Sequence, residues 1–276
     1  MKKSLTAAII YDFDGTLSPG NMQEYDFIPH LGKKPSEFWD EAKRLTVEQQ
    51  GDRILAYMEL MLKEANYKGV EVKKESFQEF GKNVELFAGA QDWFDRINAF
   101  GNALDIKVEH YIVSSGLREM IEGTLIAGKF KKIYASGYMY NSNGVAYWPA
   151  LAVNYTTKTQ FLFRINKGVL DEWDDSRINE FVAEEDRPVP FHNMIYLGDG
   201  TTDVPCMKLV KEQGGHSIAV YKSKTKGAKT DAEKLIEQQR VNFIAPADYS
   251  ENNKIDKLVK AILTKISSDN LLKNLG

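Results

Sequence analysis

Short apolar runs that end in small, polar or acidic residues constrain the fold of this chain more than any other feature. An uninterrupted apolar run of about four to eight residues is typical of a strand that is buried on both faces. The runs are residues 7–11, 110–113, 194–197 and 217–220, with shorter candidates at 132–135 and 243–245. Because strands of this kind occur in sheets that helices cover on both sides, we predict a parallel sheet.

In most of the segments between these runs, apolar residues recur at the spacing of an amphipathic helix. The predicted helices are residues 117–127, 159–170, 203–211, 231–238 and 255–266. Strands that alternate with helices predict an α/β fold with a Rossmann-like, doubly wound parallel sheet. The Asn141-Ser142-Asn143-Gly144 segment predicts a β-hairpin in addition. Ligands of doubly wound sheets bind at the carboxyl ends of strands, so the residues that end the apolar runs are the candidate site residues.

A long interval separates the first predicted strand from the second. Residues 15–113 exceed a single crossover helix, and amphipathic patterns predict helices at 36–44, 52–66, 74–80 and 90–100. We expect the last of these to be the crossover, and residues 18–88 to form a smaller helical cap domain inserted after the first strand. Residues 1–17 and 89–276 would then form the α/β catalytic core. Since the insert leaves from a strand end, it should lie above the candidate site.

The composition argues against several classes of partner. The net charge is -3, whereas a nucleic-acid-binding surface usually needs a basic excess. No apolar run approaches the roughly 20 residues of a membrane span. The apolar run after Lys3 is broken too early for a signal-peptide core, and the single cysteine, Cys206, excludes an intrachain disulfide. We therefore expect a cytoplasmic protein that binds neither nucleic acid nor membranes.

The first run ends in a pair of acidic residues. Asp12 and Asp14 are two residues apart, so on an extended segment both project from the same face. Paired carboxylates can divide their roles, with one acting as nucleophile or metal ligand and the other carrying a proton. Gly15 permits an unusual backbone angle, and Thr16 can form a hydrogen bond within the turn. Taken alone, however, the segment is better explained as a polar turn after a strand.

A second acidic pair strengthens the functional interpretation. Asp199 and Asp203 follow another apolar run, and they can face Asp12 and Asp14 if the two strands are neighbours. Four carboxylates and a phosphate dianion sum to a charge of roughly -6, which Mg²⁺ and one lysine would reduce to roughly -3. Carboxylate oxygens are ligands that Mg²⁺ prefers. The same crowding favours a raised pKa for one carboxyl, as a general acid needs.

Two further segments offer contacts for an anion. Ser114 ends its run, and its hydroxyl, with the N–H groups of Ser115 and Gly116 at the start of the predicted helix, can bind phosphate oxygens. An N-cap is the commoner meaning of such a segment. Lys158 precedes the predicted helix 159–170. It attracts attention because the candidate site contains no other obvious cation.

These segments together resemble the haloacid dehalogenase superfamily of phosphohydrolases, and most closely its phosphoserine-phosphatase-like branch with a helical (C1-type) cap. Four motifs occur in the order of that superfamily. They are residues 12–17, residues 112–116, Lys158 and residues 198–203. The motifs span most of the chain, and the first and fourth are highly specific. The resemblance implies a hydrolase of small phosphorylated metabolites whose cap selects the substrate.

The resemblance also implies a role for each motif residue. Asp12 would attack phosphorus and form an aspartyl-phosphate, while Asp14 would protonate the leaving oxygen and then activate water. The Mg²⁺ ligands would be Asp12, the backbone carbonyl of Asp14 and Asp199, with Asp203 in support. The phosphoryl group would be bound by Ser114 and Lys158, with phosphate contacts also expected from Gly15, Thr16, Ser115 and Gly116.

Two alternative functions use the same residues. A phosphotransferase or mutase of the same superfamily would pass the phosphoryl group to an acceptor other than water. A phosphorylatable receiver-type signalling domain also uses an aspartate at a strand end. The receiver interpretation does not explain the length of the insert or the second acidic pair, Asp199 and Asp203. We therefore predict a magnesium-dependent phosphatase.

Overall fold

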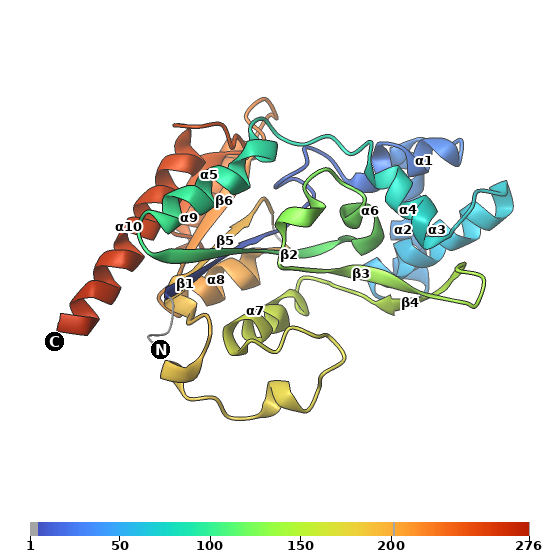
Figure 1. The fold of residues 1–276 in the computed structure, drawn as a ribbon. Helices are drawn as coiled ribbons and strands as arrows, with labels where there is room; N and C mark the ends of the chain where they lie inside the picture. The colour runs from blue at the N-terminus through green and yellow to red at the C-terminus, as the bar shows by residue number, and fades with distance from the viewer. Residues whose placement is uncertain (1–4, 201, 276) are drawn as a thin grey trace.

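The computed structural model of the chain describes residues 5–200 and 202–275. Its centre is a seven-stranded sheet of order β4-β3-β2-β1-β5-β6-β7 (Figure 1). Every neighbouring pair of strands is parallel except β3 and β4, which are antiparallel. The strands are β1 (Leu5–Tyr11), β2 (Ile106–Leu117), β3 (Lys132–Tyr140), β4 (Ala146–Leu151), β5 (Met194–Gly198), β6 (His216–Tyr221) and β7 (Phe243–Pro246). The predicted α/β, Rossmann-like fold is confirmed.

Side chains of β1 alternate between two apolar cores. Ala7, Ile9 and Tyr11 pack in a core that α5 and α10 share, whereas Ala8 and Ile10 pack in a core that α7 and α8 share. Because helices cover both faces, the strand has an uninterrupted apolar sequence. The helices of this part are α5 (Ala90–Asn102), α7 (Lys158–Lys167), α8 (Val204–Glu212), α9 (Ala228–Glu237) and α10 (Lys254–Leu275). None of the helices in residues 5–200 and 202–275 is long and apolar enough to cross a membrane.

The segment after β1 forms a group of helices at one end of the molecule (Figure 1, right). They are α1 (Phe27–His30), α2 (Pro35–Glu48), α3 (Arg53–Lys68) and α4 (Lys74–Gly81). Asp52 begins α3 by accepting hydrogen bonds from the N–H groups of Ile54 (2.8 Å) and Leu55 (3.1 Å). Apolar side chains of this group, Phe38 and Met61 among them, belong to the same core as α5. The predicted helices at 36–44, 52–66 and 74–80 are confirmed.

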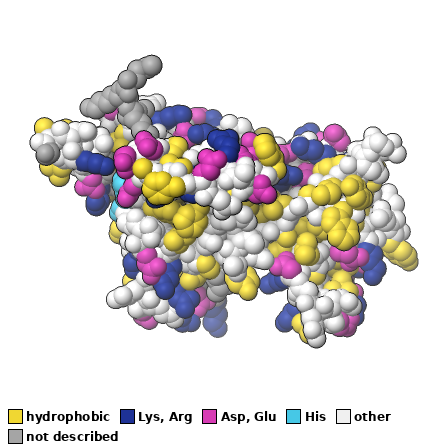
Figure 2. All heavy atoms as spheres, turned by 90° about the horizontal axis from the view of Figure 1, so that it is seen from below, with side chains coloured by type: hydrophobic (Ala, Val, Ile, Leu, Met, Phe, Trp, Pro, Cys, Tyr) yellow, Lys and Arg dark blue, Asp and Glu magenta, His cyan; other side chains and the backbone are white. Residues whose placement is uncertain are grey.

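The hairpin predicted at residues 141–144 joins β3 to β4. The Asn141 side chain accepts hydrogen bonds from the N–H groups of Asn143 and Val145, and Gly144 has a φ of 73°. The hairpin supports the helical group, because the Tyr138 hydroxyl donates to the Met58 carbonyl of α3 at 2.7 Å. Large apolar side chains remain exposed on the hairpin and after α7. They include Met139, Tyr147, Trp148, Trp173 and Phe181. Figure 2 shows one face of the molecule, on which apolar and charged side chains are mixed.

The prediction of a helix over residues 117–127 was wrong in extent. Strand β2 continues through Leu117, and the helix that follows, α6 (Arg118–Glu122), is only five residues long. It ends at Gly123, where a side chain would overlap the Gln78 carbonyl of α4. The Thr124 hydroxyl then donates to the Ile121 carbonyl. The apolar residues at helical spacing are therefore divided between a short helix and the turn after it.

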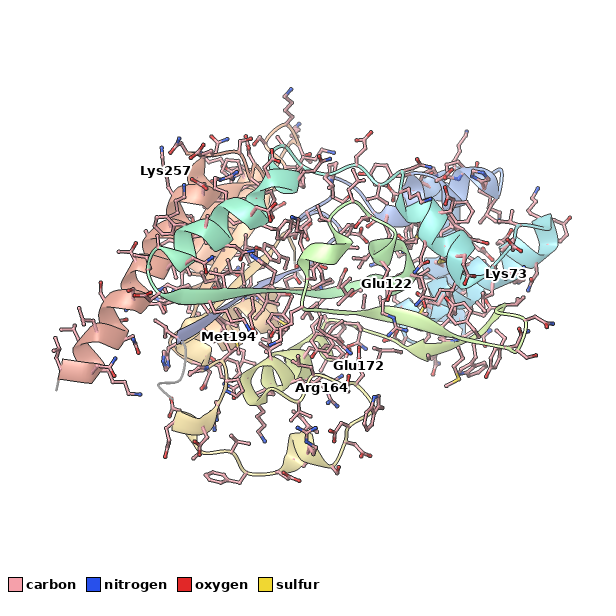
Figure 3. The ribbon with its side chains drawn as sticks, in the orientation of Figure 1. Lys73, Glu122, Arg164, Glu172, Met194 and Lys257 are labelled. Atoms are coloured by element: carbon pink, nitrogen blue, oxygen red, sulfur yellow. The ribbon has the colours of Figure 1, made fainter. Side chains whose placement is uncertain are left out.

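Helix α7 is anchored by a buried arginine. The Arg164 guanidinium donates to the backbone carbonyls of Asp171 (2.6 Å), Asp174 (3.0 Å) and Glu172 (3.1 Å). Arg164 and Glu172 lie close together below the sheet in Figure 3. Because a guanidinium carries five fixed donors, one side chain can hold several turns of the following segment. This contact fixes the helix whose first residue is Lys158.

Candidate active site

The central position of β1 brings the predicted motifs to one edge of the sheet. Tyr11, the last residue of β1, pairs with Ile112 of β2 on one side and with Leu197 of β5 on the other. Residues that follow these three positions therefore meet at the carboxyl ends of neighbouring strands. The acidic pairs and the Ser114 segment are brought together in this way.

Asp12 lies in a sharp turn and is almost completely buried. Its N–H continues the sheet by donating to the Leu197 carbonyl at 2.9 Å. One carboxylate oxygen accepts from the Phe13 N–H at 2.7 Å, and the other lies 2.8 Å from Lys158 Nζ. Gly15 has a φ of 75°, the region that favours glycine, which lets the chain turn away immediately. Both oxygens of Asp12 therefore have fixed directions.

Lys158 is fully buried at the first residue of α7. Its ammonium group bridges Asp12 Oδ2 (2.8 Å) and Asp203 Oδ1 (2.7 Å). Burial alone would lower the pKa of Lys158, but the carboxylates of Asp12 and Asp203 outweigh burial and raise it. The lysine therefore stays charged. Asp203 Oδ1 also accepts a hydrogen bond from the Tyr196 hydroxyl at 2.8 Å, a contact that the sequence analysis missed.

Three carboxylates form a cluster that can hold a cation. Asp12, Asp199 and Asp203 each offer an oxygen, and these oxygens all lie within 4.8 Å of one another. Burial, followed by the charges of the neighbouring aspartates, raises the pKa of Asp203 and that of Asp199. Asp203 Oδ2 is buried without a hydrogen-bond partner. An oxygen-only donor set with an unpaired buried oxygen fits Mg²⁺. Gly15 is required here, because a Cβ at this position would overlap the Asp199 carboxylate.

Asp14 lies beside this cluster, but its side chain points towards Met22 and Gly116. Its Oδ1 accepts a hydrogen bond from the Met22 N–H at 2.9 Å. A Cβ added at Gly116 would lie 3.1 Å from Asp14 Oδ2, so Asp14 faces the Gly116 segment. Burial, followed by the charge of Asp12, raises the pKa of Asp14 well above its usual value. Its predicted contribution to a metal site is its backbone carbonyl, and this stays a prediction.

The Ser114 segment is near the site but is not the predicted helix start. The Ser114 hydroxyl accepts from the Gly116 N–H at 3.1 Å, and the residues from Ser114 to Leu117 form an irregular strand end. The Ser115 hydroxyl is buried without a hydrogen-bond partner. Ser115 and Gly116 therefore precede α6, which begins at Arg118, and their N–H groups belong to the end of β2 instead of a helix start. A contact through the serine hydroxyls stays a prediction.

Thr16 is buried in the turn rather than open to a ligand. Its carbonyl accepts from the Tyr249 hydroxyl at 2.9 Å, and its own hydroxyl lacks a hydrogen-bond partner. Its N–H donates to the Phe13 carbonyl at 3.2 Å. Thr201, part of the fourth motif, lies outside the described residues. Cys206 is buried behind the cluster, and burial raises the pKa of its thiol to about 12.

Three aspartates around a buried lysine, at the carboxyl ends of parallel strands, form the kind of site that the sequence motifs predict. Residues 9–208 match the family model of the haloacid dehalogenase-like hydrolases, and the chain belongs to this family. It is also similar to an uncharacterised protein of Borreliella burgdorferi. The two are 29% identical in an alignment that covers 90% of this chain and 93% of that protein.

Solved structures share the fold over almost the whole chain. A HAD family hydrolase from Salmonella enterica subsp. enterica serovar Typhi is 16% identical, with a TM-score of 0.58 over 94% of this chain and 72% of that chain. A substrate-bound phosphoserine phosphatase is 13% identical, with a TM-score of 0.56 over 93% and 98%. A phosphoserine phosphohydrolase-like protein from Francisella tularensis is 21% identical, with a TM-score of 0.52 over 87% and 94%. The fold is thus that of the phosphoserine-phosphatase-like hydrolases.

Proposed function

We propose that this chain is a magnesium-dependent phosphatase that hydrolyses small phosphomonoesters through an aspartyl-phosphate on Asp12. One observation carries the proposal. The buried Lys158 ammonium bridges Asp12 and Asp203 beside a cluster of three carboxylate oxygens. Phosphoryl transfer depends mainly on positioning and on stabilising charge around the transferred group. This arrangement holds the proposed nucleophile, Asp12, in contact with a buried cation, Lys158.

The two residues of the first acidic pair suit different steps. Asp12 has both oxygens held by Phe13 and Lys158, so it can present an oxygen to phosphorus without reorganising. Attack breaks the bond to the leaving oxygen, which takes the proton of Asp14. Burial, followed by the charge of Asp12, raises the pKa of Asp14, which favours the protonated form that a general acid needs. Asp14 then accepts a proton from the water that cleaves the aspartyl-phosphate.

The excess of negative charge explains the need for a metal ion. Asp12, Asp199 and the backbone carbonyl of Asp14 would hold Mg²⁺, with Asp203 in support, and the ion would supply positive charge at the phosphoryl oxygens. Among residues 5–200 and 202–275, the cation that pairs with this cluster is Lys158, which already contacts two carboxylates. Ser114 and Ser115 lie at the carboxyl end of β2, next to β1, and Ser115 Oγ is buried without a hydrogen-bond partner, so it is free to donate.

We further propose that residues 18–88 form a cap that selects the leaving group and that residues 1–17 and 89–276 form the catalytic core. Residues 1–4 and 276 of this division lie outside the described residues. The proposed partner is a small phosphorylated metabolite, not a nucleic acid or a membrane, and the proposed location is the cytoplasm. The interspersed basic and acidic groups on the face in Figure 2 support the exclusion of nucleic acid.

An aryl phosphate such as 4-nitrophenyl phosphate tests the reaction. We expect turnover with Mg²⁺, loss of turnover with EDTA, and loss of turnover in Asp12→Asn. Full activity of Asp12→Asn would contradict the assignment of the nucleophile. A stable phosphoprotein without turnover would favour the receiver-type function. Transfer of the phosphoryl group to an added alcohol in preference to water would favour the phosphotransferase.

A further inference from the structure

Helix α3 touches the two segments that carry the anion-binding residues of the site. The Tyr57 hydroxyl, on the second turn of α3, donates to the backbone carbonyl of Ser115 at 2.7 Å. Asp52, the N-cap of α3, accepts from the Asn154 side-chain amide at 2.8 Å. Ser115 belongs to the Ser114 segment, and Asn154 begins the turn that leads to Lys158. One helix of the inserted group therefore contacts both segments directly.

The first contact is part of a longer hydrogen-bonded path. The Ser115 carbonyl also accepts from the Ser136 hydroxyl of β3 at 3.3 Å. The Ser136 hydroxyl in turn accepts from the Val153 N–H at 3.0 Å. Val153 precedes Asn154, so the path leads from Tyr57 through the Ser114 segment to the turn before Lys158. The Asp52–Asn154 bond returns it to α3 and closes the ring.

Asn154 has two functions in the turn before Lys158. Its side-chain oxygen accepts from the N–H groups of Thr156 (3.0 Å) and Thr157 (2.9 Å), which forms the turn, and its carbonyl accepts from the Lys158 N–H at 3.0 Å. Its amide nitrogen is left to donate to Asp52 Oδ2. The other Asp52 oxygen caps α3 through Ile54. Each side chain thus stabilises its own segment with one atom and joins the two segments with another.

We propose that Asp52 and Tyr57 are positioning residues that set the Ser114 segment and the Lys158 turn relative to each other. We call this ring, formed by Asp52, Tyr57, Ser115, Ser136, Val153 and Asn154, the α3 clasp. The inference deepens the proposed function and rests on it for its kinetic consequences. A residue that selects the leaving group affects some substrates and spares others. The α3 clasp instead positions the Ser114 segment and the Lys158 turn, which bind the phosphoryl group that all substrates share. Its loss therefore weakens the binding of every phosphate ester and of phosphate itself.

A matched pair of variants separates positioning from stability. Tyr57→Phe removes the hydroxyl that contacts Ser115. Tyr138→Phe removes a buried hydroxyl of the same type, which joins β3 to the Met58 carbonyl of α3 at the same distance of 2.7 Å but contacts no site segment. We expect both to lower the melting temperature similarly. Tyr57→Phe alone should raise the inhibition constant of inorganic phosphate about fivefold, the loss of one hydrogen bond.

A reciprocal exchange tests the second contact. Asn154→Asp keeps the turn, since an aspartate accepts the same backbone N–H groups, but it places a carboxylate against Asp52. We expect a rise of about tenfold in the KM of the aryl phosphate. Asp52→Asn keeps the cap of α3 but brings two amide donors together. The double variant Asp52→Asn with Asn154→Asp restores a donor and an acceptor, and should recover most of the affinity.

Hydrogen exchange provides a readout that does not depend on activity. In Tyr57→Phe and in Asn154→Asp, the amides of residues 115–117 and 156–158 should exchange about fivefold faster, while Tyr138→Phe leaves them unchanged. Equal exchange and equal phosphate inhibition in Tyr57→Phe and Tyr138→Phe would overturn the α3 clasp. A wild-type protein that shows neither turnover nor phosphate inhibition would instead overturn the proposed function, and the exchange data would still decide the α3 clasp.

Discussion

Two buried polar networks begin at neighbouring residues of β1 and differ in how completely they are paired. The Tyr11 hydroxyl accepts from Trp93 Nε1 at 2.7 Å and donates to His110 Nδ1 at 3.0 Å. His110 Nε2 lies 3.0 Å from the Asn98 side-chain oxygen, to which it donates as a neutral ring. Every member of this network is neutral and has a partner. The network at Asp12, the next residue, is built in the opposite way.

At Asp12, a cluster of three carboxylates contains one lysine that pairs with two of them. Lys158 reaches Asp12 and Asp203, while Asp203 Oδ2 is buried without a partner. Burial, followed by the charges of the neighbouring aspartates, raises the pKa of Asp199 and of Asp203. A buried network with complete pairing stabilises the fold, whereas one with incomplete pairing costs stability and leaves capacity for a ligand. This contrast is the one expected between a structural network, at Tyr11, and the proposed active site, at Asp12.

Removal of the shared cation should produce the largest effect. Lys158→Met keeps the approximate volume but leaves Asp12 and Asp203 buried without a positive charge between them. We expect the free energy of unfolding to fall by about 3–5 kcal/mol at pH 8, with loss of turnover. Chemical denaturation measures the first effect. Adding Asp203→Asn should recover part of the stability but not the activity, and a loss below about 1 kcal/mol in Lys158→Met would contradict the charge argument.

Addition of Mg²⁺ should complete the pairing of the Asp12 network. A ligand at 100 times its dissociation constant raises the free energy of unfolding by about 2.7 kcal/mol. We expect the melting temperature of the wild type to rise with Mg²⁺ and fall with EDTA, and Asp199→Asn to reduce the response. Asp248→Asn, a carboxylate that pairs with the Ser250 N–H outside the cluster, is the control. An equal response of both variants would place the ion elsewhere.

The Tyr11 network should respond to substitution in stability but not in catalysis. Tyr11→Phe leaves Trp93 Nε1 and His110 Nδ1 without their partner. We expect a loss of about 2 kcal/mol in the free energy of unfolding. Turnover of the aryl phosphate should stay within about twofold of wild type, because Asp12 keeps its contacts with Phe13 and Lys158. A tenfold fall in turnover without a change in stability would reverse the assignment of the two networks.

Mild acid should weaken the Tyr11 network gradually. Burial lowers the pKa of His110 from 6.5 to about 3. Between these values the unfolded chain binds a proton that the native chain does not, so the contribution of His110 is present above pH 6.5 and is lost as the pH falls. The expected loss is about 1.4 kcal/mol per pH unit. Denaturation at pH 6 and pH 5 should show a smaller change for His110→Gln, and identical slopes would contradict the prediction.

The sequence predicted the fold well where burial alone determines the pattern. The strands could be located because helices cover both faces of the sheet, which makes residues 7–11 and 194–197 uniformly apolar. The helix after Ser114 was overextended, since α6 stops where Gly123 meets α4. That contact joins residues distant in the sequence, and local apolar spacing carries no information about it.

The site residues, too, could be predicted only where the local sequence shows them, and not where they depend on contacts between distant segments. The charged residues of the motifs were identified because their chemistry is unusual at strand ends, and Lys158 proved to be buried between two of them. Tyr196 could have been noticed as the one hydroxyl in an apolar run that leads to Asp199. Tyr57 and Asn154 could not, because a tyrosine on an amphipathic helix and an asparagine in a turn have common structural explanations.

The strand order has a consequence for the synthesis of the protein. Asp12 is made early, at the end of the central strand, but its partners Lys158 and Asp203 are made much later, and β5 must pair with β1 before the cluster exists. Domains emerge from the ribosome amino end first, so the growing chain carries an isolated aspartate with ordinary reactivity. The proposed active site therefore cannot form before β5 has paired with β1, and a chain that ends before Lys158 and Asp203 lacks both of the ion pairs that hold this cluster.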